Sequence, residues 1–271
     1  QTPEQLILAV PAILNQTGQQ EVILGGGIRP EPFMFDNSRK KDSYFWSRNS
    51  IDELIKVNDY NAESIADYVD ENWYEPAKFY PKDTTYWSKS YIDPYTQNAM
   101  ITASVPMWSD HQFIGVSTVD IARSSLDDFF STAVANTGGY VFALDQQNRI
   151  LSYPDNESND NQTIKNSQLF LPFADFAKSH PAFTPLQNKI SKIDQQFIKT
   201  ANNMKAYEDG QPSNVITNTP SQEREKLIAM INQNANNPLK DVEVLASIQL
   251  TNDPRLNEPV LVSVFLMPGT Y

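Results

Sequence analysis

The sequence predicts an α+β protein with an N-terminal helix and two modules of antiparallel sheet. Two observations predict this class. Segments with the helical spacing of apolar residues alternate with segments rich in strand-forming residues. In addition, glycines, a strand, a polar turn and a second strand follow one another after Gly25 and again from Gly138, and the β-rich segment 98–107 matches segment 258–267 in length. This weak internal repeat indicates two homologous modules.

The N-terminal helix is predicted at residues 1–24, ahead of a first module at 25–135 and a second at 136–271. Thr2 suits the N-cap of this helix and Pro3 suits its first turn. Apolar residues then recur on one helical face, at Leu6, Val10, Ile13 and Leu14. We expect this helix to form the contact of a homodimer.

The first module is predicted to open with a β-hairpin. The glycines 25–27 end the helical pattern, and strand-like runs at 31–36 and 43–48 flank a polar turn. Segment 61–79 favours one or two short helices.

Long strands and long helices are predicted further along the chain. The β runs 98–108 and 112–121 flank a short turn. In the second module an amphipathic helix begins near Thr184, another follows Pro220, and the strand 258–267 comes last. Because the first module has a return strand and the second does not, we expect the chain to be a fragment that lacks the closing strand of its second sheet.

Composition restricts the classes of partner. The 271 residues are 40 % hydrophobic, enough to bury a large core, and the formal net charge is −12. Such a charge argues against nucleic acid or an anionic membrane surface and favours a cationic ligand. No apolar run approaches the roughly 20 residues that cross a bilayer.

The residues indicate no enzyme, metal or cofactor. There is no cysteine, His111 lies in an apparent turn, and His180 precedes a proline in a loop, so neither histidine belongs to a triad or a zinc motif. The Asn/Asp-rich segment 155–163 lacks the turn glycine and terminal glutamate of a calcium loop, and we interpret it as a solvated loop. A non-catalytic protein is predicted.

Aromatic and acidic side chains are concentrated in the first module. Aromatic faces together with buried carboxylates suit recognition of an ammonium group. Asp120 is the sharpest candidate because it follows an apolar strand, where an unpaired carboxylate is costly. The alternative interpretations are that the rings fill a core and that Asp120 caps the helix that follows it. The candidate site residues are Trp46, Arg48, Tyr60, Glu71, Trp73, Tyr74, Trp87, Tyr91, Asp93 and Asp120.

Four segments in this order resemble the double CACHE (dCACHE) sensor domains of bacterial chemoreceptors, histidine kinases and diguanylate cyclases. They are "NWYEPAK" (72–78), "YWSKSYIDPYTQNAMITASVP" (86–106), "FIGVSTVDI" (113–121) and "GGYVFALDQQNRILSYPD" (138–155). The resemblance implies two PAS-like modules behind a long helix. It also implies a periplasmic location, a membrane anchor in the full-length protein, and ligand binding by the first, membrane-distal module.

The resemblance also implies roles for individual residues. In amino-acid-binding members of the family, a Trp-Tyr pair lines the pocket and an aspartate holds the ammonium group; Trp73, Tyr74 and Asp120 stand at these positions. Glu71 stands where those members have an arginine that clamps the ligand carboxylate, and it would repel a carboxylate. This departure argues for an amine-containing ligand rather than a standard amino acid, with Arg48 as another source of the cation.

We therefore expect a sensor that binds a small polar, amine-containing molecule and passes the signal through helices to a cytoplasmic output domain. Two alternatives stay open at this stage. Clustered aromatic and acidic residues also suit a carbohydrate-binding or glycoside-hydrolysing protein. A module whose site is filled by its own side chains would serve only as a dimerising spacer.

Overall fold

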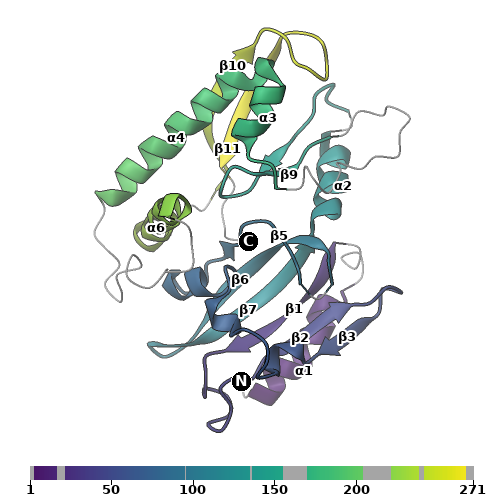
Figure 1. The fold of residues 1–271 in the computed structure, drawn as a ribbon, viewed down its shortest axis with the longest axis vertical. Helices are drawn as coiled ribbons and strands as arrows, with labels where there is room; N and C mark the ends of the chain where they lie inside the picture. Colours follow the sequence, from purple (N-terminus) through teal and green to yellow (C-terminus); the bar gives the residue numbers. More distant parts are fainter. Residues whose placement is uncertain are drawn as a thin grey trace. The chain divides into compact units, whose positions relative to one another are not determined.

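The computed structural model describes residues 3–16, 22–94, 96–134, 136–154, 170–203, 221–237 and 241–266. The chain forms two compact units that divide within helix α2 (Arg123–Val134): unit 1 extends to Leu126 and unit 2 begins at Asp127. Figure 1 shows helices and antiparallel strands in both units, so the predicted mixture of the two is confirmed. Within the described ranges, no helix is both long and apolar enough to cross a bilayer.

The N-terminal helix is shorter than predicted. Helix α1 spans Pro3–Leu14, and strand β1 already begins at Ile23 and runs to Pro30. The predicted boundary at residue 24 is therefore wrong, because the three glycines belong to a strand rather than to a break before one. A Cβ on Gly27 would lie 2.1 Å from the carbonyl oxygen of Tyr44, so only glycine allows the neighbouring strand to approach this closely.

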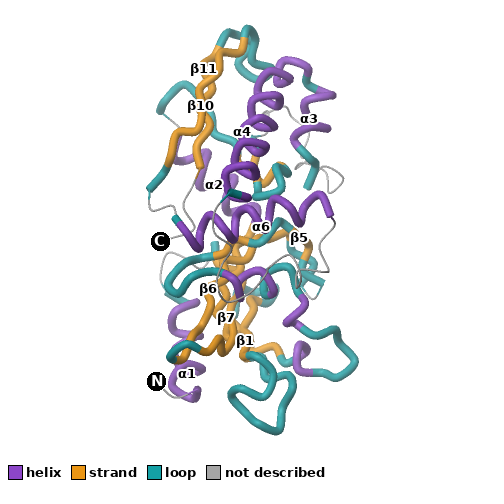
Figure 2. Tube along the Cα trace, turned by 90° about the vertical axis from the view of Figure 1, so that its left-hand side faces the viewer, coloured by secondary structure: helices purple, strands orange, loops and turns teal. Residues whose placement is uncertain are grey.

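Unit 1 contains one antiparallel sheet in the order β3-β2-β1-β7-β6-β4, and β5 also pairs with β6. Strands β6 and β7 are the two long predicted runs, and they lie side by side in Figure 2. The predicted hairpin is wrong in its first strand, because β2 pairs with β1 and residues 31–36 form a turn region. The strands after β1 are β2 (Tyr44–Arg48), β3 (Leu54–Val57), β4 (Tyr86–Trp87), β5 (Tyr91–Ile92), β6 (Ala99–Ser109) and β7 (Gln112–Ala122).

Three short 3₁₀ helices follow β3, in the region where the sequence predicted short helices. They are η1 (Asp59–Asn61), η2 (Tyr68–Asp70) and η3 (Glu75–Phe79). Each carries buried side chains, including Tyr60, Tyr68 and Phe79. Helix η3 contacts both β6 and β7, so this segment supplies aromatic side chains to the sheet.

The two faces of the unit 1 sheet differ in character. One face is apolar and packs against α1, through a cluster that includes Val10, Leu14, Ile28 and Trp46. Side chains alternate between faces along a strand, so the neighbours of Ile28 and Trp46 point to the opposite face. That second face carries buried polar side chains, and it holds the candidate site.

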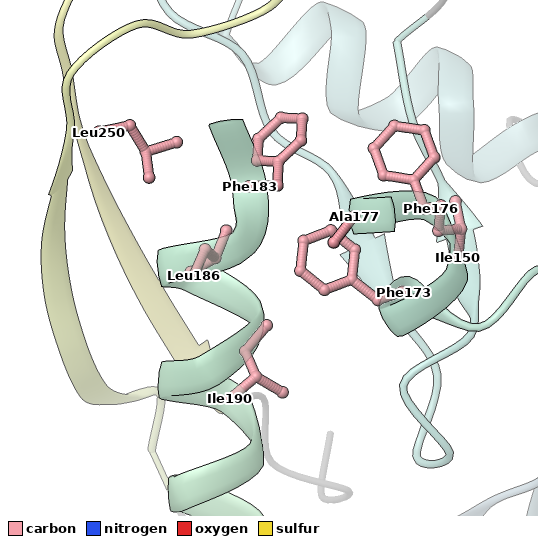
Figure 3. Close-up of a cluster of buried hydrophobic side chains, with 8 residues drawn as sticks. All are labelled: Ile150, Phe173, Phe176, Ala177, Phe183, Leu186, Ile190 and Leu250. Carbon is pink, nitrogen blue, oxygen red and sulfur yellow. The ribbon is translucent and has the colours of Figure 1, made fainter. Parts of the chain in front are cut away.

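Unit 2 packs helices against short antiparallel strands. Its apolar cluster joins α3 and α4, where Phe173, Phe183, Leu186 and Ile190 converge (Figure 3). Pro185 lies in the first turn of α4, as predicted. The predicted loop 155–163 lies outside the described residues. The elements of unit 2 are β8 (Ala143–Leu144), β9 (Ile150–Ser152), α3 (Phe173–Ser179), η5 (Pro181–Phe183), α4 (Thr184–Asn202), α6 (Ser221–Asn236), β10 (Glu243–Leu250) and β11 (Val260–Leu266).

Candidate functional site

The candidate site is a patch of buried polar side chains on the second face of the unit 1 sheet. The register pairs Thr102 with Asp120 and Ser104 with Thr118 across β6 and β7, so these four residues share one face. All four are buried, and Asp120 is only 6 % exposed. Because buried polar groups are unfavourable unless they are hydrogen-bonded, a patch of this kind on a sheet face needs an explanation beyond packing.

Asp120 is the central acidic group of the patch. The hydroxyl of Thr102 donates to its Oδ1 at 2.7 Å, and among the described residues this is its one side-chain hydrogen bond. Asp120 lies within β7, ahead of the strand end at Ala122, and this bond directs its carboxylate across the sheet rather than to the start of α2. Burial raises the pKa of Asp120 to about 6, although Arg29 and Thr102 partly oppose the shift and Asp93 adds to it.

A chain of hydrogen bonds fixes the protons around Asp120. The Tyr91 hydroxyl lies 2.7 Å from Thr102 Oγ1. Thr102 has one hydroxyl proton, which it donates to Asp120, so Tyr91 must be the donor in this pair. Burial, and then the charge of Asp120, raise the pKa of Tyr91 well above its usual value, which keeps this proton in place. Toward any further partner, the Tyr91 oxygen and an ionised Asp120 therefore offer only acceptors.

A buried arginine occupies the same face, and the sequence analysis missed it. Arg29 of β1 is 2 % exposed, and its guanidinium carbon lies 4.3 Å from the ring centroid of Phe45. The rings of Tyr60 and Trp73 lie at 5.1 Å and 5.2 Å from the same atom. The guanidinium therefore stands between three aromatic rings, an arrangement that favours a cation.

The hydrogen bonds of Arg29 are few for a buried cation. Its Nη1 donates to Thr118 Oγ1 at 3.4 Å, and its buried Nε has no partner among the described residues. A Cβ on Gly27 would lie 2.8 Å from Nη1, so the side chain of Arg29 folds back over the glycine strand. Had the glycines been assigned to a strand, alternation would have placed Arg29 opposite Ile28, on the buried polar face.

Two further acidic residues lie near this patch. Asp93 is buried and its Oδ2 accepts from the backbone amide and the hydroxyl of Thr96, at 2.7 Å and 2.8 Å, so it holds a turn together. Burial, followed by the charges of Asp70 and Asp93, raises the pKa of Glu71. In the described part of the chain no cation pairs with Glu71, so it adds negative potential beside Asp93.

Trp73 and Tyr74, the predicted Trp-Tyr pair, make different contacts. Trp73 contributes its ring to the site, packed edge-on against Tyr60 at 6.2 Å between centroids. The hydroxyl of Tyr74 instead donates to Glu31 Oε1 at 2.9 Å, and Lys78 pairs with the same carboxylate oxygen. Tyr74 therefore supports the ring of Trp73, which it contacts, while its polar end is bound in a separate network.

Three residues of the predicted set lie apart from this patch. Trp46 points to the apolar face and packs in the cluster with Leu14. Arg48 donates to the carbonyl oxygens of Leu14 and Ile23, at 3.0 Å and 2.9 Å, so it fastens α1 and cannot be the missing cation of the site. Trp87 pairs with Ala103 and therefore faces away from Thr102.

The structure brings together Tyr60, Trp73, Tyr91 and Asp120 from the predicted set, with Glu71 and Asp93 nearby, and adds Arg29. Over the part of the chain that is described, no three His, Asp or Glu side chains are grouped to hold a metal ion. The chemistry available is recognition: acceptors at Asp120, a cation at Arg29, and aromatic faces between them.

A model of a known family matches the first part of the chain. Residues 10–128 match the family model described as "Methyl-accepting chemotaxis protein-like, first PDC sensor domain". The matched segment contains α1 in part, the whole sheet of unit 1 and the start of α2. No curated protein matches the sequence.

Solved structures give weaker likenesses. A methyl-accepting chemotaxis protein X is 23 % identical, with a TM-score of 0.44 over 58 % of this chain and 60 % of that one. The extracellular domain of mmHK1S-Z2, a candidate histidine kinase, is 15 % identical, with a TM-score of 0.47 over 96 % and 75 %. The ligand-binding domain of Pseudomonas fluorescens chemoreceptor CtaA, in complex with L-valine, is 19 % identical, with a TM-score of 0.36 over 55 % and 57 %.

These TM-scores lie below 0.5 and establish no detailed correspondence, so the assignment rests on the match of residues 10–128. The matched family consists of receptor sensor domains and not of enzymes. The expected resemblance to CACHE-type sensor domains is confirmed for this segment, which is similar to the first PDC sensor domain of methyl-accepting chemotaxis protein-like proteins.

Proposed function

We propose that unit 1 is the ligand-binding part of a sensor and that it recognises a small polar molecule through an ammonium group held by Asp120. The observation that carries this proposal is the buried carboxylate of Asp120, which has one side-chain hydrogen bond and, among the described residues, no ion pair, although the charge of Arg29 acts on it from the same sheet face. Such a group favours a bound cation because a charge pair offsets part of its desolvation.

The proton arrangement supports a primary ammonium group in particular. Asp120 and Tyr91 present acceptors only, because the hydroxyl proton of Tyr91 is already directed to Thr102. A primary ammonium group has three donors, whereas a quaternary ammonium has none. We therefore propose that methylation of the ligand nitrogen weakens binding stepwise as donors are lost.

The aromatic rings support a compact ligand. Tyr60 and Trp73 stand over the same sheet face and are held edge-on to one another. Their faces favour cations and apolar groups over anions. A small amine would therefore lie with its nitrogen at Asp120 and its carbon atoms toward the rings.

The proposed signal begins at β7. Helix α2 starts at Arg123, directly after β7 ends at Ala122, so a shift of Asp120 on ligand binding acts on the strand that leads into this helix. We propose a population shift in the position of α2. In the full-length receptor this would pass from an extracytoplasmic module, anchored in the membrane and dimeric through α1, to a cytoplasmic output domain.

The alternative of a carbohydrate-active protein receives no support from the comparisons. The family match is to a sensor domain, and the carboxylate Asp93 is committed to its own turn.

A thermal-shift screen of amines, amino acids, purines and organic acids tests the proposal, because a specific ligand raises apparent stability by mass action. We expect Asp120→Ala to abolish the stabilisation by the best compound while the protein still unfolds cooperatively. Asp128→Asn, an exposed carboxylate on α2, is the matched control and should respond like the wild type. Stabilisation that persists in Asp120→Ala would refute the role of Asp120.

A further inference from the structure

We infer that Arg29 is an internal counter-charge for Asp120: three aromatic rings hold its guanidinium group near enough to support the charge of the carboxylate, but not in contact with its oxygens. Arg29 thereby keeps the carboxylate ionised and open to a ligand at neutral pH. It is a positioning residue for the proposed function of Asp120, on which this inference rests. Its place on the sheet face, its ring cage and the acidic groups around Asp120 support this role.

Arg29 and Asp120 lie on neighbouring strands and on the same face of the sheet. The register pairs Arg29 with Val116 of β7, and its Nη1 donates to Thr118 Oγ1 at 3.4 Å. Thr118 stands two residues before Asp120, and positions i and i+2 of a strand are about 7 Å apart. Both side chains are buried, so water and salt screen their attraction little. The charge of Arg29 opposes the effect of burial on the pKa of Asp120 more than the hydrogen bond from Thr102 does.

The aromatic rings fix the guanidinium group away from the carboxylate. The ring centroids of Phe45, Tyr60 and Trp73 lie 4.3, 5.1 and 5.2 Å from its central carbon. Ring faces stabilise a cation without supplying an anion. Within the described ranges Arg29 makes no ion pair, so it does not occupy the oxygens of Asp120. A direct arginine–carboxylate pair would fill those oxygens with parallel hydrogen bonds and leave few acceptors for a ligand.

The other ionisable groups near Asp120 cannot replace this charge. Asp93, which follows β5, is a like charge and raises the pKa of Asp120. Tyr91 of β5 keeps its proton, and Tyr60 of η1 only raises the pKa of Tyr91 further. Burial alone would favour the protonated form of a carboxylate that is 6 % exposed. Arg29 therefore helps to hold the pKa of Asp120 at about 6, which leaves the carboxylate ionised at pH 7.

A competing interpretation makes Arg29 a purely structural residue that supports the three rings. That role requires only a long side chain in contact with the rings, and an apolar side chain would fill it without the desolvation of a charge. A counter-charge requires the positive charge itself. The two interpretations therefore predict different titrations of Asp120 when the charge is removed and the length of the side chain is kept.

The experiment follows the titration of Asp120 in the ligand-free protein by NMR of isotope-labelled aspartate carboxyl groups. Asp120→Asn identifies the resonance, because it lacks it. Arg29→Met removes the charge and keeps a long side chain that packs on rings, whereas Arg29→Lys keeps the charge. We expect a midpoint near pH 6 in the wild type and in Arg29→Lys. In Arg29→Met we expect it to rise by about one pH unit or more, as a unit charge about 7 Å away gives at an effective dielectric constant of about 20.

The titration alone decides the role of Arg29. A midpoint in Arg29→Met within about 0.3 pH units of the wild-type value overturns the inference. A midpoint in Arg29→Lys that rises as far as in Arg29→Met also overturns it, because the shape of the side chain would then matter and the charge would not. Should Arg29→Met not unfold cooperatively, Arg29→Gln is titrated in its place and is held to the same limits.

Amine binding separates this inference from the proposed function. The probes are methylammonium, propylammonium and ethanolammonium, added at about pH 8.5, where the carboxylate is ionised. We expect Arg29→Met to bind the best of them about tenfold more tightly than the wild type, because a guanidinium group repels an ammonium group at Asp120 as it repels a proton. Equal or weaker binding by Arg29→Met contradicts the inference. Absence of binding in every protein, or undiminished binding by Asp120→Asn, refutes the proposed function and leaves the result of the titration standing.

Discussion

Asp120 and Arg29 are two buried, charged residues on the sheet face of the candidate site. Both are buried, they have opposite charges, and within the described residues neither makes an ion pair with a neighbour. Each is instead held by a threonine on the same sheet face, Thr102 for the carboxylate and Thr118 for the guanidinium. The site thus keeps two desolvated charges available, a condition that is unfavourable for stability and useful for binding.

The buried charge of Asp120 should lower the stability of the ligand-free protein at neutral pH. The pKa of Asp120 is about 6 in the folded protein, above its value in the unfolded chain. Between these two pKa values the folded state binds more protons than the unfolded state, so the free energy of unfolding falls as the pH rises through this range. Asp120→Asn lacks this charge, and we expect it to be more stable than the wild type at pH 7.5 by roughly 1–3 kcal/mol. Urea unfolding at pH 4.5 and pH 7.5 measures the difference. A variant that is less stable at pH 7.5 would contradict the desolvation of Asp120.

Ligand binding should depend on pH in the opposite direction. An ammonium ligand pairs with the ionised form of Asp120, which is lost as pH falls through about 6. We expect the affinity of the best amine from the thermal-shift screen to be constant above pH 7 and to fall by up to about tenfold per pH unit below pH 6. Calorimetric titration between pH 5 and pH 8 measures this profile. Affinity that rises on acidification would contradict binding to a carboxylate.

At the scale of elements, the glycine strand β1 makes the site possible. It lies between β2 and β7, and its glycines let the backbone of β2 approach while the side chain of Arg29 folds over Gly27. The other face of β1 meets α1 through Ile28. The same strand therefore separates the apolar core from the polar site.

Helix α1 should depend on Arg48, which fastens its C-terminal end. Arg48→Ala removes the bonds to the carbonyl oxygens of Leu14 and Ile23, and we expect a loss of about 2–4 kcal/mol in the free energy of unfolding. Asp52→Asn is the matched control, since it removes the charge of an exposed partner of Arg48 and keeps a side chain that tolerates the left-handed backbone at this position (φ 64°), so it should change stability by less than about 0.5 kcal/mol. Denaturant unfolding compares the two, and equal effects would show that Arg48 does not hold α1.

The sequence predicts some elements of unit 1 better than others. The sequence predicts strands β6 and β7 because both runs contain several β-branched residues and a short polar turn joins them. Strand β1 was missed because Gly25, Gly26 and Gly27 have no side chain whose alternation could be recognised. Arg29 was missed together with its strand. Asp120 and Trp73 were found because acidic and aromatic residues next to apolar runs are visible without knowing the pairing.

The sequence alone could not show which face of the sheet each side chain of β2 occupies. Trp46 and Arg48 stand on β2, and which face they occupy depends on the pairing of β2 with β1. Their neighbours Phe45 and Ser47 point to the polar side instead. A shift of one residue in register would move Trp46 and Arg48 to the polar face and their neighbours to the apolar face. Local spacing alone therefore could not assign these side chains to the apolar core or to the candidate site.

For the whole molecule, the two units differ in how far their function can be assigned. Unit 1 contains nearly all of the family match and the whole candidate site. Unit 2 has its own apolar cluster of α3, α4 and the adjoining strands, and its relation to a second sensor module stays a prediction. The net charge of −12 would raise the local concentration of a cationic ligand near the protein.

The most direct test of the central claim is a crystal structure of the protein with the best-binding amine from the thermal-shift screen. We predict that the ligand nitrogen lies within hydrogen-bond distance, about 2.7–3.2 Å, of the Asp120 carboxylate, with Tyr60 and Trp73 beside the ligand. A ligand bound away from this sheet face, or one that places an anionic group against Asp120, would contradict the account.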